Sequence, residues 1–214
     1  MIRKLLIAVL GLSVSACAQP GPRNSGVYLL LDTSGTYAGQ LRKAQEIINY
    51  TLSRLDSLDS FAVARIDTGS FSDKDIVAKV TFDDRPSAMN AQKRQFAHTV
   101  AKFLAHVKPS EYTDITGGLL QAVEFLNEKK TAHKTILIFS DMKQDLKSGY
   151  VRNIPVPLKG FDVVALNVTK LHSDNVDPRE YLDRLKVWRK RVESQGGHWR
   201  VINDLDHLES LLKT

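Results

Sequence analysis

An uninterrupted apolar run at residues 27–31 is followed directly by Asp32-Thr33-Ser34-Gly35-Thr36. A short apolar run of this kind predicts a buried strand, and the Asp-Thr-Ser-Gly segment predicts the turn that ends it. Open α/β sheets place their ligands at the carboxyl ends of strands, and this turn brings a carboxylate and two hydroxyls there. Hard oxygen ligands suit a small divalent cation better than a covalent reaction.

Strand-like and helix-like segments alternate along the rest of the chain. A second fully apolar run at 135–139 predicts another buried strand, whereas polar–apolar alternation at 75–82 predicts a half-exposed strand near an edge. We expect further strands at 61–66, 161–168 and 198–202. Apolar residues at helical spacing predict helices at 40–58, 87–107, 116–129, 178–195 and 204–212. Such alternation favours a mostly parallel sheet with helices on both faces.

The first residues have the composition of an export signal. Arg3 and Lys4 form a positive n-region, residues 5–14 are an apolar segment, and Ser15-Ala16 is a small-residue cleavage site. The apolar segment is shorter than the roughly 20 residues that a membrane-spanning helix needs.

Segment 12–17, Leu-Ser-Val-Ser-Ala-Cys, resembles a bacterial lipobox, in which the cysteine is diacylated and becomes the new N-terminus. An ordinary secretory signal would leave Cys17, the only cysteine, as an unexplained lone thiol. Acyl chains on Cys17 would anchor the protein to a membrane. In a Gram-negative host, Ala18 in place of Asp implies the periplasmic face of the outer membrane. We expect a signal peptide, a lipidated cysteine with a flexible tether, and one domain, at 1–16, 17–25 and 26–214.

The charge balance does not indicate a nucleic-acid partner. The chain has 30 Lys and Arg against 24 Asp and Glu, and two of the basic residues lie in the leader. A mild excess spread along the chain is typical of a solvated surface. We interpret the basic run Lys186, Arg189, Lys190 and Arg191 in the same way, rather than as a contact with anionic lipid.

Two later segments carry polar side chains to the same expected edge of the sheet. Asp141 follows the strand at 135–139, just as Asp32 follows the first strand. Between them, a polar turn that contains Thr113 leads into a helix. Because both apolar strands are expected at the sheet centre, two carboxylates and several hydroxyls would surround one cavity. Mg²⁺ takes octahedral oxygen ligands and retains several waters, so this set predicts a magnesium site.

At these residues the chain resembles the von Willebrand factor A-type domain and its metal-ion-dependent adhesion site. The family pattern is Asp-x-Ser-x-Ser, then a threonine in a later loop, then an aspartate after a central strand. Asp32, Ser34 and Thr36 match the first part, with Thr in place of the last Ser. Thr113 matches the loop threonine, and Asp141 matches the final aspartate. Three segments in order, over roughly residues 26–205, are more specific than one short motif.

The resemblance implies a Rossmann-like three-layer α/β sandwich, whose six-stranded, mostly parallel sheet has one antiparallel edge strand. It implies that the hydroxyls of Ser34 and Thr36 bind Mg²⁺, Mn²⁺ or Ca²⁺ directly. Asp32 and Asp141 would bind the same ion directly or through water. Thr113 would enter and leave the coordination shell as ligand binds. An Asp or Glu carboxylate of a partner protein would fill the open metal position. Met142 departs from the pattern, because the family commonly has glycine there.

A phosphohydrolase of the haloacid dehalogenase class is an alternative. Those enzymes also place a nucleophilic Asp after an apolar strand, and Asp141 with Asp145 imitates their late metal-binding pair. However, Ser34 stands where a general acid/base Asp is usual, so an aspartyl intermediate on Asp32 would lack its proton donor.

Other readings are a protease, another metal site or a scaffold without metal. The triplets that begin at Asp32 and Asp67 resemble those of aspartic proteases, but those enzymes are β-rich. No histidine has zinc-ligand spacing or is placed to activate Ser140. In a metal-free structural scaffold, Ser34 and Thr36 would only make turn hydrogen bonds. We expect a lipid-anchored, metal-dependent protein-binding module of the cell envelope, not an enzyme.

Overall fold

The computed structural model of the chain describes residues 24–35, 40–67, 69–166, 178–202 and 208. Its strands are β1 (Ser25–Asp32), β2 (Ser60–Ile66), β3 (Ile76–Thr81), β4 (His133–Phe139), β5 (Phe161–Leu166) and β6 (His198–Ile202). Its helices are α1 (Leu41–Arg54), α2 (Pro86–His106), α3 (Ile115–Glu128) and α4 (Pro178–Glu193), with a short 3-10 helix, η2, at Asp73–Asp75. The leader at 1–16, Cys17 and, apart from residue 208, the helix expected at 204–212 lie outside the described residues.

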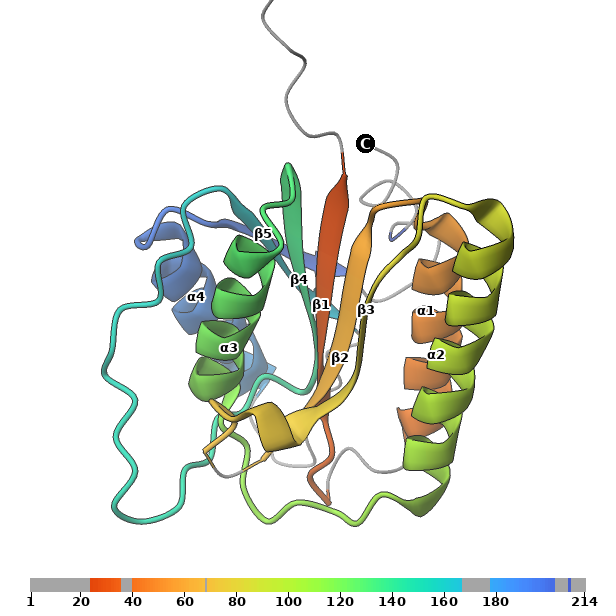
Figure 1. Ribbon diagram of the computed structural model, residues 1–214. Coiled ribbons are helices and arrows are strands. Elements are labelled where there is room, and N and C mark those ends of the chain that lie inside the picture. The colour runs from red at the N-terminus through yellow and green to blue at the C-terminus, as the bar shows by residue number, and fades with distance from the viewer. Residues whose placement is uncertain (1–23, 36–39, 68, 167–177, 203–207, 209–214) are drawn as a thin grey trace, which may run out of the picture.

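The strands form one sheet in the order β3-β2-β1-β4-β5-β6. Every neighbouring pair is parallel except β2 and β3, which are antiparallel. Helices α1 and α2 cover one face of this sheet, and α3 and α4 cover the other (Figure 1). The expected three-layer α/β sandwich with one antiparallel edge strand is therefore confirmed.

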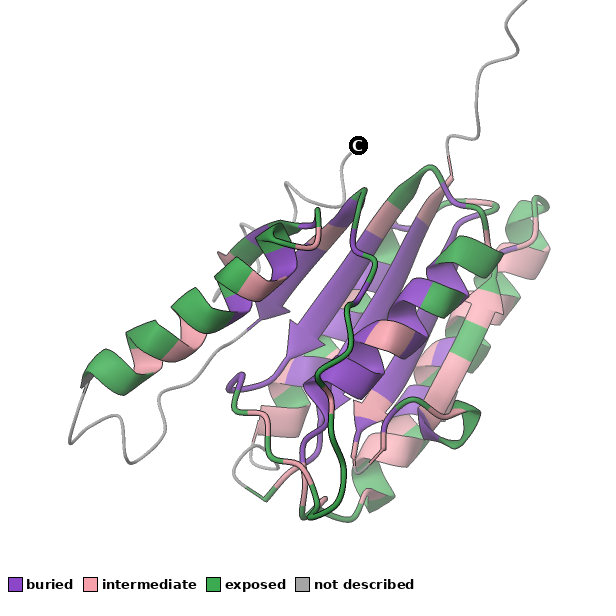
Figure 2. Cartoon of the chain, turned by 90° about the vertical axis from the view of Figure 1, so that its left-hand side faces the viewer, coloured by how far each residue is buried: buried purple, intermediate pink, exposed green. Residues whose placement is uncertain are grey.

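The continuously apolar runs form the centre of the sheet. Residues 27–31 of β1 and 136–139 of β4 are almost completely buried, because each strand has a neighbour on both sides and helices on both faces. Figure 2 shows this buried sheet between helices whose outer surfaces are exposed. By contrast, β3 alternates between partly buried and exposed residues along its second half, which is typical of an edge strand.

Side chains of successive strand residues point to opposite faces, so the core has two halves. Tyr28 and Leu30 pack toward α3 and α4, whereas Leu29 and Leu31 pack toward α1 and α2. Trp188, on α4, lies in the first half of the core. Within the described residues, no helix is both long and apolar enough to cross a membrane.

The connection between β4 and β5 contains no regular helix or strand and follows the surface. It extends beyond the lower end of the sheet in Figure 1 before it returns to β5. Val156 and Leu158 anchor its second half, because both are buried against the α3–α4 side of the core. Its first half, which remains largely exposed, borders the candidate site.

Candidate metal centre

The carboxyl ends of β1 and β4 lie side by side in the middle of the sheet. After β1 the chain continues toward β2 on one side, whereas after β4 it continues toward β5 on the other. Ligands of open α/β sheets bind at such a switch point, because the loops that leave the two strands diverge. Asp32 ends β1 and Asp141 closely follows β4, so both lie at this position.

Backbone hydrogen bonds hold the three motif segments together. The Ser110 amide donates to the Thr33 carbonyl at 2.9 Å, which joins the segment after α2 to the turn after β1. The Thr113 amide donates to the Asp145 carbonyl at 2.7 Å, and the Asp145 amide donates to the Thr113 carbonyl at 3.0 Å. The structure thus places segment 110–113 between the loops that follow β1 and β4.

Asp32 is a completely buried carboxylate whose hydrogen-bond donors among the described residues are neutral. Its Oδ1 accepts from the Ser34 amide at 2.9 Å, and its Oδ2 accepts from the Ser140 hydroxyl at 2.7 Å. Asp32 forms no ion pair with any described residue. Burial of a carboxylate without a counter-charge is unfavourable, so this position favours a bound cation. Ser140, for which the sequence offers no activating histidine, instead positions Asp32.

Asp141 lies close enough to Asp32 for their charges to interact. Its Oδ1 accepts from the Lys143 amide at 2.8 Å, and Arg184 Nε donates to its backbone carbonyl at 2.8 Å. Burial is the main effect that raises the pKa of Asp141, and the negative charge of Asp32 raises it further. The Lys143 amide and the charges of Arg184 and Lys143 act in the opposite direction. A divalent cation beside both carboxylates would offset burial and repulsion together.

Met142 occupies the position where the family pattern commonly has glycine. Its φ is 63°, in the left-handed region that glycine adopts without strain. Its amide donates to the Ser140 hydroxyl at 3.0 Å, and its carbonyl accepts from Trp188 Nε1 at 2.8 Å. Its side chain is also fully buried. These tertiary contacts therefore hold a backbone conformation that a non-glycine residue disfavours.

The three candidate hydroxyl ligands are Ser34, Thr36 and Thr113. Ser34 is partly buried and forms a backbone bridge with Ser110. Thr113 is 4 % exposed and lies between the two strand loops. Thr36 lies outside the described residues. The neighbouring Thr33 hydroxyl is buried and has no hydrogen-bond partner in the described part of the chain.

A second layer of polar residues supports the Thr113 segment. Asp114 caps α3 by accepting from the Gly117 amide at 2.8 Å, and it accepts from Arg152 Nε at 2.8 Å while fully buried. Gln144 Oε1 accepts from the amide and hydroxyl of Thr116 at 2.9 and 2.6 Å. These contacts were not predicted from the sequence. The cap follows a common Asp pattern, but nothing local marks Arg152 as the partner of Asp114.

The geometry does not support the aspartic-protease alternative. Asp67 directly follows β2. Its carboxylate pairs with Arg65 at 2.9 Å and accepts a hydrogen bond from the Ser110 hydroxyl at 2.6 Å. It therefore does not form a proton-sharing pair with Asp32 in a β-rich protease. The described residues contain no group of three His, Cys, Asp or Glu suited to a metal. A metal here would consequently rely on hydroxyl ligands, as the sequence pattern predicts.

The solvated-face interpretation of the basic run holds for Lys186, Arg189 and Lys190, which are exposed. Arg191 is the exception. It is partly buried, and its Nη2 donates to the Arg152 carbonyl at 2.9 Å.

The residues at the switch point fit a small divalent cation. Asp32 supplies a buried negative charge without a basic partner, and Asp141 adds a second carboxylate at short range. Ser34 and Thr113 carry hydroxyls on the two flanking segments. Mg²⁺ prefers such hard oxygen ligands and tolerates coordinated water at its remaining positions.

Several solved structures share this fold at low sequence identity. The von Willebrand factor type A structure from Catenulispora acidiphila has a TM-score of 0.55 and 16% identity, over 89% of this chain and 41% of that chain. The pilus adhesin SpaC from Lactobacillus rhamnosus GG has a TM-score of 0.56 and 11% identity, over 91% of this chain and 30% of that chain. The PilB minor pilin from Streptococcus sanguinis has a TM-score of 0.51 and 13% identity, over 90% of this chain and 60% of that chain.

No protein-family model and no curated protein matches the sequence. The chain spans less than half the length of the Catenulispora and Lactobacillus proteins. At these identities the likeness concerns the fold alone. The chain thus has a von Willebrand factor A-like α/β fold, with the candidate site at the carboxyl edge of its central strands.

Proposed function

We propose that this protein is a lipid-anchored, divalent-metal-dependent protein-binding module of the bacterial cell envelope. The buried carboxylate of Asp32, which has only neutral donors around it, is the observation that carries the proposal. A bound Mg²⁺ would neutralise this charge and leave a position for an anionic oxygen of a partner. A partner protein would supply that oxygen from an Asp or Glu side chain.

Each residue of the site has a separate task in this proposal. Ser34 and Thr36 would contact the metal through their hydroxyls, and Asp32 and Asp141 would hold it directly or through water. Thr113 would respond to ligand, because it lies on a segment bonded to both strand loops. Ser140 keeps Asp32 in place by donating to its Oδ2.

Binding accounts for the geometry better than phosphoryl transfer does. A nucleophilic aspartate must reach the phosphorus atom, but Asp32 is completely buried and both its oxygens accept hydrogen bonds. Ser34 is also a poor proton donor for such a reaction. The pilus adhesin and the minor pilin that share the fold support an adhesion or assembly role. The lipobox-like segment that ends at Cys17 supports an anchor at the membrane.

Thermal unfolding in the presence of MgCl₂ or MnCl₂ tests the metal site. The mature chain would carry Cys17→Ser and be stripped with EDTA beforehand. At about 100 times the dissociation constant, the metal should add roughly 2.7 kcal/mol of stability, a rise of about 5–11 °C in Tm. Asp32→Asn and Asp141→Asn should abolish the rise, whereas Asp145→Asn, at an exposed position of the same loop, should retain it. Metal dependence would be refuted if the metal did not raise the Tm of the wild type, or if it raised the Tm of the Asp32→Asn and Asp141→Asn variants as much as that of the wild type.

Membrane attachment needs a separate experiment. The unaltered chain, expressed in a Gram-negative host with radiolabelled palmitate, should take up label and sediment with the outer membrane. Cys17→Ser should release it to the soluble fraction. An unlabelled wild type would contradict the anchor without affecting the metal site.

A further inference from the structure

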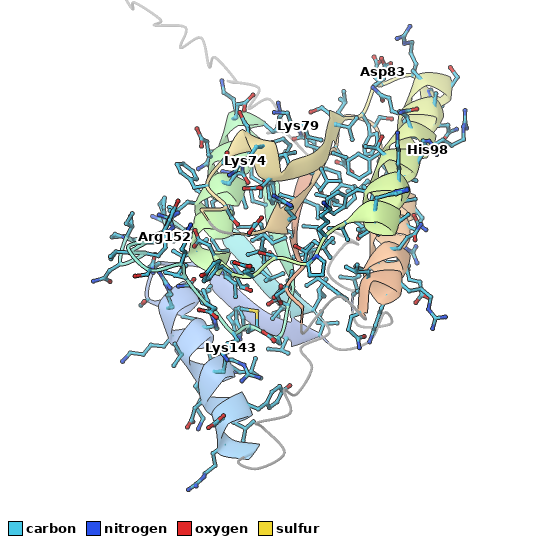
Figure 3. All side chains as sticks on the ribbon, turned by 90° about the horizontal axis from the view of Figure 1, so that it is seen from below. Lys74, Lys79, Asp83, His98, Lys143 and Arg152 are labelled. Carbon is cyan, nitrogen blue, oxygen red and sulfur yellow. The ribbon has the colours of Figure 1, made fainter. Side chains whose placement is uncertain are left out.

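An open groove of about 710 Å³ lies between the loop that follows β4 and the C-terminal part of α4. Figure 3 shows Arg152 in the region between α3 and α4 when the sheet is viewed from its lower end. The groove is separate from the candidate metal ligands, but Gln144 lines it and also contacts the start of α3. None of the metal-site predictions requires a groove at this position.

The wall of the groove carries large apolar side chains that are exposed to solvent. Tyr150, Val151 and Ile154 are 45 %, 72 % and 48 % exposed, and all three line the groove. They lie within five residues of one another, whereas most other exposed large apolar residues are scattered. A contiguous exposed apolar surface of this kind is typical of a site that a partner covers.

The groove also contains a cation, Arg191, that makes no direct ion pair within the described part of the chain. Arg152 pairs with the buried Asp114 beneath it, but Arg191 forms no ion pair with any described residue. Arg191 lies over the Trp188 ring, 5.3 Å from its centre, and is partly buried. That burial lowers the pKa of Arg191, which the charge of Asp114 only partly opposes. None of the described residues that line the groove is Asp or Glu, and two are Arg, so the described lining is positively charged.

The geometry points to this groove as a docking site for a segment of a partner protein that carries a carboxylate among apolar side chains. The carboxylate pairs with the Arg191 guanidinium, and the flanking apolar side chains cover Tyr150, Val151 and Ile154. An acidic group binds most favourably here because Arg191 is already partly desolvated and forms no direct ion pair with any described residue. A basic segment would meet the Arg191 cation of the same sign, so the groove discriminates by charge.

This docking does not depend on the proposed metal. The groove residues contact one another and α4, and none of them is a candidate metal ligand. Binding at the groove should therefore persist in EDTA. Loss of metal binding by Asp32→Asn should leave the groove functional, so failure of one proposal is distinguishable from failure of the other.

A random dodecapeptide display library, selected against the Cys17→Ser chain in EDTA, is the probe. The selection should enrich peptides that combine Asp or Glu with large apolar residues. The affinity of the strongest peptide and of its Asn/Gln counterpart would then be measured by fluorescence anisotropy. Arg191→Gln, Val151→Ser and removal of the peptide's charge should each weaken binding by about tenfold or more.

Two control variants are matched to these substitutions. Arg189→Gln and Val187→Ser also alter exposed side chains of α4, but neither residue lines the groove. Both should change affinity by less than about twofold. Arg191→Lys, which retains the charge, should keep part of the affinity lost in Arg191→Gln. Thermal melts of all variants verify that each remains folded.

Three results would overturn the proposal. Enrichment of neutral or basic peptides, or of none, would contradict acidic recognition. Full binding by Arg191→Gln would place the peptide elsewhere on the protein. Sedimentation velocity without peptide provides the third result, because self-association that Val151→Ser abolishes would assign the groove to a second copy of this chain.

Discussion

Replacing Arg152 with Met tests the buried ion pair that joins the loop after β4 to the start of α3. Met keeps an apolar chain of similar length but removes the guanidinium, whose Nε lies 2.8 Å from Asp114 Oδ2. Asp114 is fully buried, and its remaining partner is the Gly117 amide that it caps. The substitution therefore leaves a buried carboxylate with one neutral hydrogen bond.

The structure sets the expected magnitude. Loss of one member of a buried ion pair costs about 3–5 kcal/mol of unfolding free energy. The Arg152 side chain is 17% exposed, so water can reach the pair and the lower end of that range, about 3 kcal/mol, applies. Loss of the Arg152 contact with the Tyr150 ring, at 5.7 Å, adds about 0.5 kcal/mol. For a domain of this size the combined loss corresponds to a fall in Tm of about 7–14 °C.

Urea unfolding followed by circular dichroism, in EDTA, measures this loss. Asp114→Asn in the Arg152→Met background should recover most of it, because Asn can still accept from the Gly117 amide without burying a charge. Arg85→Met is the control, since Arg85 pairs with Asp83 at a side chain that is 74% exposed, and should have little effect. A loss below about 1 kcal/mol, or a double variant as unstable as the single one, would refute the reasoning.

Two further predictions concern the site charges and the packing of α3. Because the pKa of Asp141 is raised in the folded state, its contribution to stability in EDTA should fall as pH rises through the interval between its ordinary and raised values. In saturating Mg²⁺ the ionised form is required, so the difference in Tm between wild type and Asp141→Asn should instead rise with pH; equal slopes would contradict the site. Gly118→Ala should cost about 1–2 kcal/mol in urea unfolding, because its Cβ would lie 2.7 Å from Leu30 Cδ2 in the buried core. Gly35→Ala, whose Cβ would meet nothing within 4 Å, should change stability by less than about 0.5 kcal/mol, and equal losses in the two variants would exclude the packing explanation.

The sequence alone was sufficient to predict the class of fold and the strands and α-helices of the described residues. Continuous apolar runs marked β1 and β4 as central strands, and alternation marked β3 as an edge strand. These signals are local, because burial on two faces or one face leaves its own periodicity in neighbouring residues. The order of strands and helices then restricted the topology, since parallel neighbours need a long crossover connection, which is usually a helix.

The sequence also predicted which segments would meet. Asp32, Thr113 and Asp141 were placed at one edge from their strand and turn contexts, and the structure brings their segments together through backbone hydrogen bonds. Coordination of a metal by these residues remains a prediction. The position of Thr36, the remaining hydroxyl of the first segment, lies outside the described residues.

Only the tertiary structure decided which polar groups are paired and which are left without a partner. Ser140 donates to Asp32 across 108 positions of sequence, and Arg152 reaches Asp114 across 38. The left-handed backbone of Met142 likewise depends on distant contacts, including the indole of Trp188. Arg191 belonged to an ordinary basic run in the sequence, yet the fold buries it partly in a groove without carboxylates. Such partnerships arise from the packing of layers, whereas local periodicity records only whether a residue faces the core or the solvent.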